Sequence, residues 1–194
     1  IPAFGYVILE VESHDSVNRS IIEEWLNKLF ENKLVSDGIL AQSVKDQRDI
    51  WAFRENITES LSHEGLVHKN DIAVPISKID SFIKDLLSAL QEAHPHFVVY
   101  LFGHIGDGNL HINVTKPNTM EKDEFIHKCQ DADEIIFKLI LKYKGSIAAE
   151  HGIGLVKKKY LHYSRSPGEI ELFKKIKKQL DPKNILNPGK IVDM

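Results

Sequence analysis

Two hydrophobic patterns alternate along the chain. Short runs rich in β-branched and aromatic residues predict strands at 5–12, 38–41, 72–75 and 146–149, and a β-hairpin over 97–115. Apolar residues at helical spacing predict helices at 16–32, 46–63, 77–93 and 122–144, then a mostly helical segment from 154 to 180 and a turn-rich tail. Ser77 is the expected N-cap of the third helix, and Gly145 is expected to end the fourth.

The order of these elements indicates the fold class. Strands and helices alternate, but the hairpin requires neighbouring strands that run antiparallel. We therefore predict an α+β fold: a ferredoxin-like, mostly antiparallel sheet with helices packed on one face, plus a helical C-terminal segment. Neither a glycine-rich dinucleotide-binding loop nor a Walker lysine loop occurs in the sequence.

The hairpin holds the most informative residues. If Asp107-Gly108 forms a two-residue loop, His104 lies directly opposite His111. Alternation along the strands then gives one face to His104, His111 and Asn113. The other face is wholly apolar and is expected to be the core: Phe97, Val99, Leu101, Ile105, Leu110, Ile112 and Val114.

This register would bring two imidazoles to one place. Opposed β-carbons lie about 5 Å apart, a spacing that suits two ligands of one metal ion. Glu150, at a strand end beside glycines, would complete a His-His-Glu set with an open position, as in catalytic zinc sites. Taken alone, the pair fits surface histidines on a wet sheet face equally well, and Glu150 fits an exposed turn residue better.

Composition limits the other possibilities. Hydrophobic residues make up 42%, charged residues 27%, and the net charge is −3, so nothing indicates a nucleic-acid partner. No apolar run approaches the ~20 residues of a membrane span. The single cysteine, Cys129, excludes a disulfide within the chain, favours a reducing compartment (cytoplasm or mitochondrial matrix), and is expected to be a half-buried helix residue. The chain starts without methionine or signal peptide, so we expect it to be cut from a longer one.

Three sequence blocks together resemble one family. They are His-Ile-Gly-Asp-Gly-Asn-Leu-His (104–111), Glu-His-Gly-Ile-Gly (150–154) and Asp-Pro-Lys-Asn-Ile-Leu-Asn-Pro-Gly-Lys (181–190). They are similar to the signature blocks of FAD-linked oxidases of the vanillyl-alcohol-oxidase type, in the branch of the D-lactate and D-2-hydroxyglutarate dehydrogenases. The resemblance implies that residues 1–194 form one substrate- and metal-binding cap domain, and that FAD is bound mainly by an N-terminal domain absent from this chain.

The resemblance also implies roles for individual residues. A divalent metal, usually zinc, would be held by His104, His111 and Glu150, with His151 as the active-site histidine. The residues implied to bind the substrate are Arg54, Thr58, Lys69 and Asn113. Those implied to contact the flavin cofactor are Glu150 and Asn187. By pattern alone, Arg54 and Thr58, one helical turn apart, fit a solvated helix face, and the run Lys157-Lys158-Lys159 fits a wet surface.

The reaction implied is oxidation of a D-2-hydroxy acid, D-2-hydroxyglutarate or D-lactate, to the 2-oxo acid. Metal-assisted loss of the hydroxyl proton to His151 would accompany hydride transfer to FAD, and an unidentified acceptor would take the electrons. The isolated chain is expected to be inactive. Two other classes stay open: a metal-dependent hydrolase that uses an activated water, and a non-catalytic binding domain.

Overall fold

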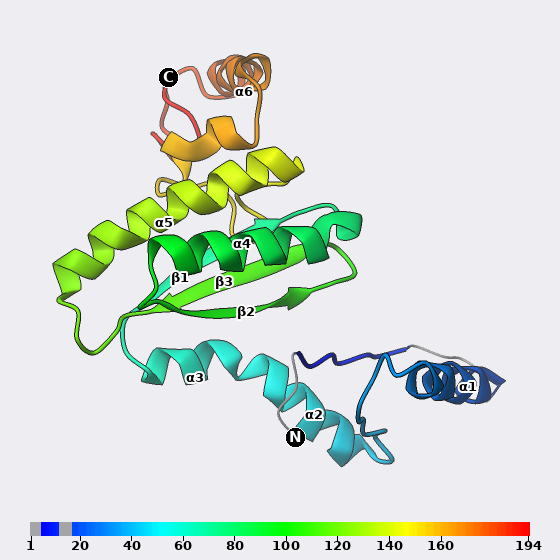
Figure 1. Ribbon diagram of the computed structural model, residues 1–194. Coiled ribbons are helices and arrows are strands. Elements are labelled where there is room, and N and C mark those ends of the chain that lie inside the picture. Colours follow the sequence, from blue (N-terminus) through cyan, green and yellow to red (C-terminus); the bar gives the residue numbers. More distant parts are fainter. Residues whose placement is uncertain (1–4, 12–16) are drawn as a thin grey trace. The chain divides into compact units, whose positions relative to one another are not determined.

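A three-stranded antiparallel sheet organises the larger unit of the computed structural model (Figure 1). Its strands are β1 (Val67–Ala73), β2 (Val98–His104) and β3 (Asn109–Thr115), with β3 in the middle. The structure describes residues 5–11 and 17–194. It divides into two units, Ile1–Ser60 and Leu61–Met194, and the sheet belongs to the second.

The first unit is helical. It contains α1 (Val17–Glu31) and α2 (Val44–Glu55), and α3 (Ile57–His63) begins in it. Ser43 caps α2, because its side chain accepts a hydrogen bond from the Asp46 N–H at 3.1 Å. The single helix predicted over 46–63 is wrong: it breaks at Asn56, which is the C-cap of α2.

Two strands predicted in the first unit are absent. Residues 5–11 and 38–41 are extended or irregular, without a pairing strand, and residue 12 lies outside the described part of the chain. Their apolar side chains are exposed, with Val7 at 74% and Ile39 at 87%. Residues with high strand propensity form a strand only when another strand pairs with them, and no described residues pair with these two segments.

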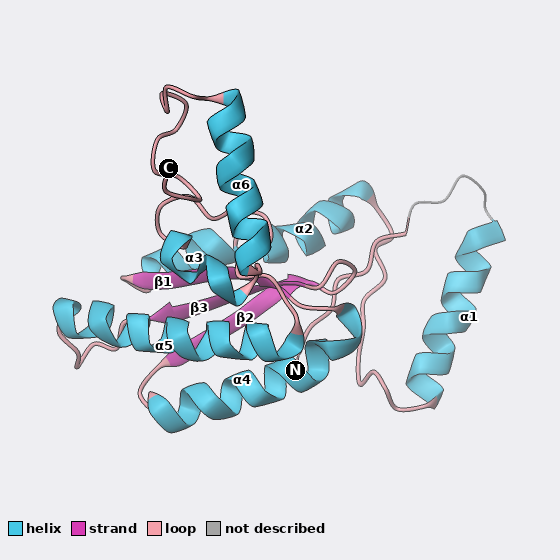
Figure 2. Ribbon diagram, turned by 90° about the horizontal axis from the view of Figure 1, so that it is seen from above, coloured by secondary structure: helices cyan, strands magenta, loops and turns pink. Residues whose placement is uncertain are grey.

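The second unit follows the predicted order of strands and helices. After β1 come a 3-10 turn, η1 (Ile76–Lys78), and α4 (Ile79–Ala93); after β3 comes α5 (Lys122–Tyr143). Ser146 then bridges Ala73, so the order at the sheet is 146, β1, β3, β2. Helices α4 and α5 lie side by side on one face of the sheet (Figure 2). The predicted α+β class is confirmed, although the strand predicted at 146–149 is reduced to this bridge.

The core lies between the sheet and the two helices. It includes Ile72, Ile112 and Val114 from the sheet, Phe82, Leu86 and Leu90 from α4, and Phe125, Ile136, Phe137 and Ile140 from α5. The predicted apolar face is therefore correct for β3, where Leu110 is buried as well. Ile105 is the exception, because it lies in the hairpin turn and is 57% exposed.

Two predicted helix ends differ in detail. The residue before α4 is Lys78, which makes no side-chain capping bond, so Ser77 is not the cap. At the end of α5 the left-handed residue is Lys144, with φ 57°. Gly145 has another role: a β-carbon there would lie 2.4 Å from the carbonyl oxygen of Ala73. Glycine therefore permits the close approach of this segment to β1.

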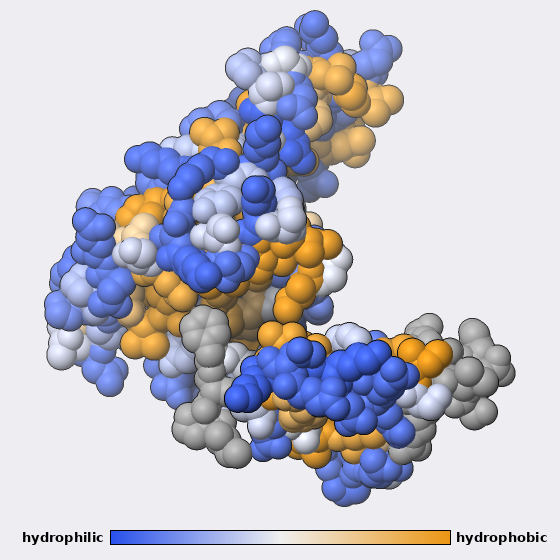
Figure 3. All heavy atoms as spheres, turned by 45° about the vertical axis from the view of Figure 1, so that its right-hand side comes forward, coloured by the Kyte–Doolittle hydropathy of each residue, from blue (hydrophilic) through white to orange (hydrophobic). Residues whose placement is uncertain are grey.

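The C-terminal segment is helical, as predicted. It contains η2 (Lys158–Tyr163) and α6 (Pro167–Leu180), whose capping box joins Ser166 and Glu169. Hydrophobic patches are visible on the surface in the space-filling view (Figure 3). The exposed large apolar residues of this part of the chain include Leu155, Val156, Leu172, Leu180, Ile185 and Leu186. Among the described residues, no helix combines the length and the apolar character that a membrane crossing requires.

Candidate active site

The polar face of the sheet arranges the predicted site residues in rows. Each row takes one residue from each strand, in the order β1, β3, β2. The rows are Lys69–Asn113–Tyr100, Asp71–His111–Phe102 and Ala73–Asn109–His104. Successive rows are two residues apart along each strand, so their side chains share one face.

The predicted register of the hairpin is wrong by two residues. His104 lies opposite Asn109, and His111 lies opposite Phe102. The loop is longer than predicted because the Asp107 carboxylate accepts the Asn109 N–H at 2.9 Å and the Gly108 carbonyl accepts the Val74 N–H at 3.0 Å. A shift of two residues preserves the face, so His104 and His111 remain on the same side of the sheet.

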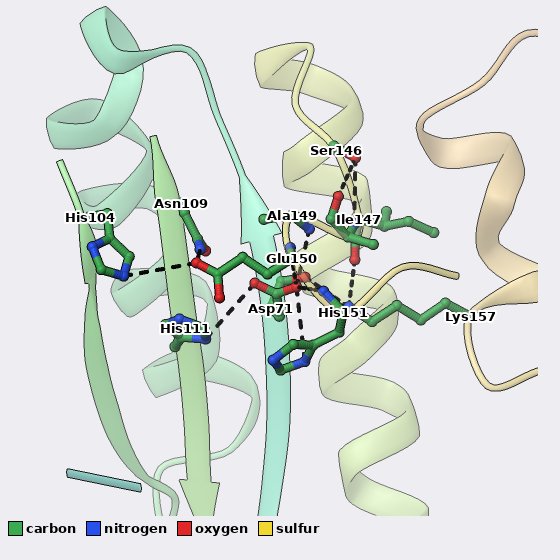
Figure 4. A network of polar contacts seen from close by, with 11 residues as sticks. Asp71, His104, Asn109, His111, Ser146, Ile147, Ala149, Glu150, His151 and Lys157 are labelled. Atoms are coloured by element: carbon green, nitrogen blue, oxygen red, sulfur yellow. Dashed lines mark hydrogen bonds and ion pairs between the residues drawn. The ribbon is translucent and has the colours of Figure 1, made fainter. Parts of the chain in front are cut away.

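Glu150 joins these two histidines. Donor atoms of His104, His111 and Glu150 all lie within 4.8 Å of one another. Figure 4 marks the contact between His104 Nε2 and Glu150 Oε1, which lie 3.8 Å apart. The side-chain amide of Asn109 donates to the same Glu150 oxygen. Two imidazoles and a carboxylate at this spacing fit a divalent ion such as zinc.

Asp71 is the site residue that the sequence analysis missed. Its side chain is fully buried, and Oδ2 accepts hydrogen bonds from the backbone N–H groups of Ala149, Glu150 and His151 at 3.1, 2.8 and 2.8 Å. Burial alone would raise the pKa of Asp71, but the N–H groups of His151 and Glu150 outweigh it and hold the pKa below its usual value. The available signal was weak, because Asp71 differs from neighbouring polar residues only in that it directly precedes the apolar segment Ile72-Ala73-Val74.

His151 lies beside the metal-ligating set and faces solvent. Its side chain is 61% exposed, and Nδ1 lies 3.9 Å from Asp71 Oδ2. Its ring centroid is 5.9 Å from that of His111, which stacks on Phe102 at 5.0 Å. Asp71, His111 and His151 therefore form a second group of possible ligands that shares His111 with the first. Asp71 is less suited to ligation, since three N–H groups already occupy one of its oxygens.

The predicted substrate contacts fall into both units. Lys69 and Asn113 are opposite residues on the polar face. Lys69 is exposed, and its ammonium group has no hydrogen bond or ion pair with any residue that the structure describes. Arg54 belongs to α2 and Thr58 to α3, so they do not share one helix as predicted, and both belong to the first unit.

Asn187 lies in the tail after α6. It is exposed, with φ 48°, and its carbonyl accepts the Lys190 N–H at 3.3 Å. The tail itself is joined to the 150–154 segment, because the Ile191 N–H donates to the Gly154 carbonyl at 3.0 Å.

Lys157 also departs from the prediction of a wet surface. Its Nζ donates to the backbone carbonyls of Asp71 at 2.7 Å and Ile147 at 2.6 Å. Burial lowers the pKa of Lys157, although the negative charges of Asp71 and Asp133 oppose this effect. This lysine is thus part of the structure beneath the site.

Comparison with known proteins identifies the family of this chain. Residues 2–191 match the family model of the FAD linked oxidases, C-terminal domain. A D-2-hydroxyglutarate dehydrogenase of Stutzerimonas stutzeri is 43% identical over 186 residues, covering 96% of this chain and 40% of the relative. The mitochondrial D-2-hydroxyglutarate dehydrogenase of Arabidopsis thaliana is 37% identical over 188 residues, covering 96% of this chain and 32% of the relative. The mitochondrial D-2-hydroxyglutarate dehydrogenase of Danio rerio is 36% identical over 186 residues, covering 95% of this chain and 34% of the relative.

The chain thus spans 40% or less of the length of these relatives. The family match, in contrast, extends over almost the whole chain. The chain therefore belongs to the family of FAD-linked oxidase C-terminal domains.

Proposed function

We propose that this chain is the substrate- and metal-binding cap domain of an FAD-dependent dehydrogenase that oxidises D-2-hydroxyglutarate to the 2-oxo acid. The observation that carries the proposal is the set of His104, His111 and Glu150, whose donor atoms lie within 4.8 Å of one another on the polar sheet face. The names of the relatives support this substrate class. D-Lactate is a second substrate candidate, with one carboxylate fewer.

Each residue of the site has a proposed role. His104, His111 and Glu150 would hold a divalent ion, most suitably zinc, which supplies Lewis-acid chemistry that lowers the pKa of the substrate hydroxyl. Asn109 donates to the Glu150 carboxylate and so restricts its orientation. Glu150 and Asn187 would lie on the side of this domain that faces FAD. The rest of the parent protein would hold most of the FAD, which would supply the hydride acceptor.

His151 is the proposed general base. Its imidazole is exposed beside the ligand set, and the ordinary pKa of histidine lies near neutral pH. Asp71 Oδ2 lies 3.9 Å from Nδ1, so the Asp71 carboxylate stands beside the ring and can help to orient it.

Substrate carboxylates would be bound by cationic and polar side chains. Lys69 has no ionic partner among the described residues, and Asn113 lies opposite it. This pair lies one row along the sheet from His111. Its side chains would therefore be close enough to contact a substrate bound to a metal ion at His104, His111 and Glu150. Arg54 and Thr58 would contribute a guanidinium group and a hydroxyl group.

The remainder of the parent protein is the proposed macromolecular partner. The relatives are more than twice as long as this chain. The exposed apolar side chains of the C-terminal segment, Leu172 and Leu180 on α6 and Ile185 and Leu186 after it, suit contact with another domain.

The experiment uses the intact parent protein, with D-2-hydroxyglutarate as substrate and a dye as electron acceptor. We expect substrate-dependent bleaching of the flavin, and His151→Asn should lower kcat by about 10²–10⁴-fold. His162→Asn, at an exposed histidine of η2, is the matched control and should retain activity. A protein that carries FAD but oxidises no D-2-hydroxy acid would contradict the proposal and return attention to a metal-dependent hydrolase or a binding domain.

A further inference from the structure

The segment that carries Glu150 has little backbone pairing with its neighbour β1. A single bridge joins them, in which Ala73 and Ser146 exchange hydrogen bonds of 2.9 and 2.7 Å. A regular strand would continue the ladder through residues 147–151. Because the chain leaves the sheet here, the turn that presents Glu150 and His151 needs other bonds to stay in place.

Two charged side chains supply such bonds between β1 and this segment. The Asp71 carboxylate accepts three successive backbone N–H groups, from Ala149 to His151. The Lys157 ammonium group donates to the carbonyls of Asp71 and Ile147. Both link β1 to the segment that follows the bridge, so side chains replace the missing ladder (Figure 4).

The second oxygen of Asp71 faces a proposed metal ligand. Asp71 Oδ1 is buried and has no hydrogen-bond partner, and His111 Nδ1 lies 3.8 Å from it, an ion-pair distance. A buried carboxylate oxygen without a partner is costly, so a proton on Nδ1 is favoured. A neutral ring with its proton on Nδ1 has a free electron pair on Nε2, which is the form that binds a metal.

We propose that Asp71 is the positioning residue of the site: one carboxylate oxygen holds the turn that presents Glu150 and His151, and the other selects the metal-binding tautomer of His111. The inference rests on the proposed function, because it takes His111 and Glu150 as metal ligands. Asp71 itself is not a ligand in this proposal. It controls two of the three ligands from its position on the polar face, directly opposite His111.

Asp71→Asn in the intact protein tests the proposal. The amide keeps the shape and one accepting oxygen, but its NH₂ group would face His111 Nδ1 and favour the opposite tautomer. The matched control is Asp133→Asn, which changes another buried aspartate that accepts bonds from His68 and Asn70 on the core side of β1. Zn²⁺ affinity is measured by competition with a chromophoric chelator, and Co²⁺ absorption reports the ligand field.

We expect Asp71→Asn to bind Zn²⁺ about 10–100-fold more weakly than the unmodified protein and to change the Co²⁺ spectrum. Asp133→Asn should alter neither. Unchanged Zn²⁺ affinity in Asp71→Asn, alongside loss of binding in His111→Ala, would overturn the role of Asp71 and leave the proposed function standing. No Zn²⁺ binding by the unmodified protein would overturn both.

Hydrogen exchange in the unmodified protein gives a test that needs no variant to fold. The amides of Ala149, Glu150 and His151 should exchange far more slowly than those of the exposed residues Leu155 and Val156. Equal exchange rates in the two segments would overturn the proposed hold of Asp71 on the turn.

Discussion

Lys69 of β1 lies directly opposite Asn113 of β3, one row along the sheet from the opposed pair Asp71 and His111. The strand pairing therefore sets an ammonium group that has no ionic partner among residues 5–11 and 17–194, and an amide, beside the proposed metal ligands. A 2-hydroxy dicarboxylate needs a group for its hydroxyl end and cations for its carboxylates, and this face offers both within neighbouring rows.

The first prediction concerns Lys69. Lys69→Met removes the ammonium group but keeps most of the side-chain length. A charge-assisted hydrogen bond contributes about 1.5–3 kcal/mol, so kcat/KM for D-2-hydroxyglutarate should fall roughly tenfold or more. D-Lactate, which lacks the second carboxylate, should lose less. Lys138→Met, an exposed lysine of α5, is the control. Equal losses for both substrates would show that Lys69 binds only the shared carboxylate.

The second prediction concerns the hairpin turn. Gly108 has φ +78°, and a β-carbon there would lie 2.0 Å from the Val74 carbonyl oxygen. Gly108→Ala should therefore lower the free energy of unfolding by about 1–3 kcal/mol or more, and should weaken metal binding by moving Asn109. Gly106→Ala, in the same turn, meets nothing within 4 Å and is the matched control. Similar unfolding midpoints for the two variants in urea would contradict this structure of the turn.

The third prediction concerns pH and stability. Burial lowers the pKa of His94, and Lys128 adds to this effect while Asp131 opposes it. The unfolded chain then binds the proton more tightly than the folded one. The contribution of neutral His94 to the free energy of unfolding is therefore fully present above the ordinary histidine pKa of about 6.5. It is lost as the pH falls from there toward the lower pKa of the folded state.

His94→Phe tests this sign. The replacement can still stack on Phe97, and the buried Nε2 that it removes has no hydrogen-bond partner. Urea unfolding between pH 5 and 8 should show a smaller decrease in stability toward low pH for the variant than for the unmodified protein. Parallel curves would mean that His94 does not titrate differently in the folded state.

The fourth prediction concerns Cys129. It is 2% exposed on α5 rather than half-buried, and burial raises the pKa of its thiol to about 12. The thiolate is the reactive form, so the native protein should not react with Ellman's reagent on the time scale that suffices for the unfolded chain. Rapid reaction at equal rates in both states would show that this helix face is open.

The sequence pattern was sufficient for the fold class and for the shared face of His104 and His111. Alternation along the strands depends only on local geometry. The register could not be predicted from the same pattern. The length of the loop depends on the hydrogen bond from the Val74 N–H to the Gly108 carbonyl, which joins the hairpin turn to the segment after β1. The strands predicted at 5–12 and 38–41 failed for the related reason that pairing is a tertiary property.

Asp71 and Lys157 show another limit of the sequence. Their partners are backbone groups far along the chain, at Ala149–His151 for Asp71 and at Asp71 for Lys157. Backbone acceptors and donors leave no trace in residue type, so neither role could be deduced from composition or spacing.

Metal content of the intact protein tests the ligand set most directly. Elemental analysis should find about one divalent ion per chain in the unmodified protein, and in His127→Ala, which changes an exposed histidine on α5. His111→Ala should lose the ion, because one of three protein ligands is removed. Full occupancy in His111→Ala, or an unmodified protein that retains no divalent ion after exposure to zinc, would contradict a metal site at His104, His111 and Glu150.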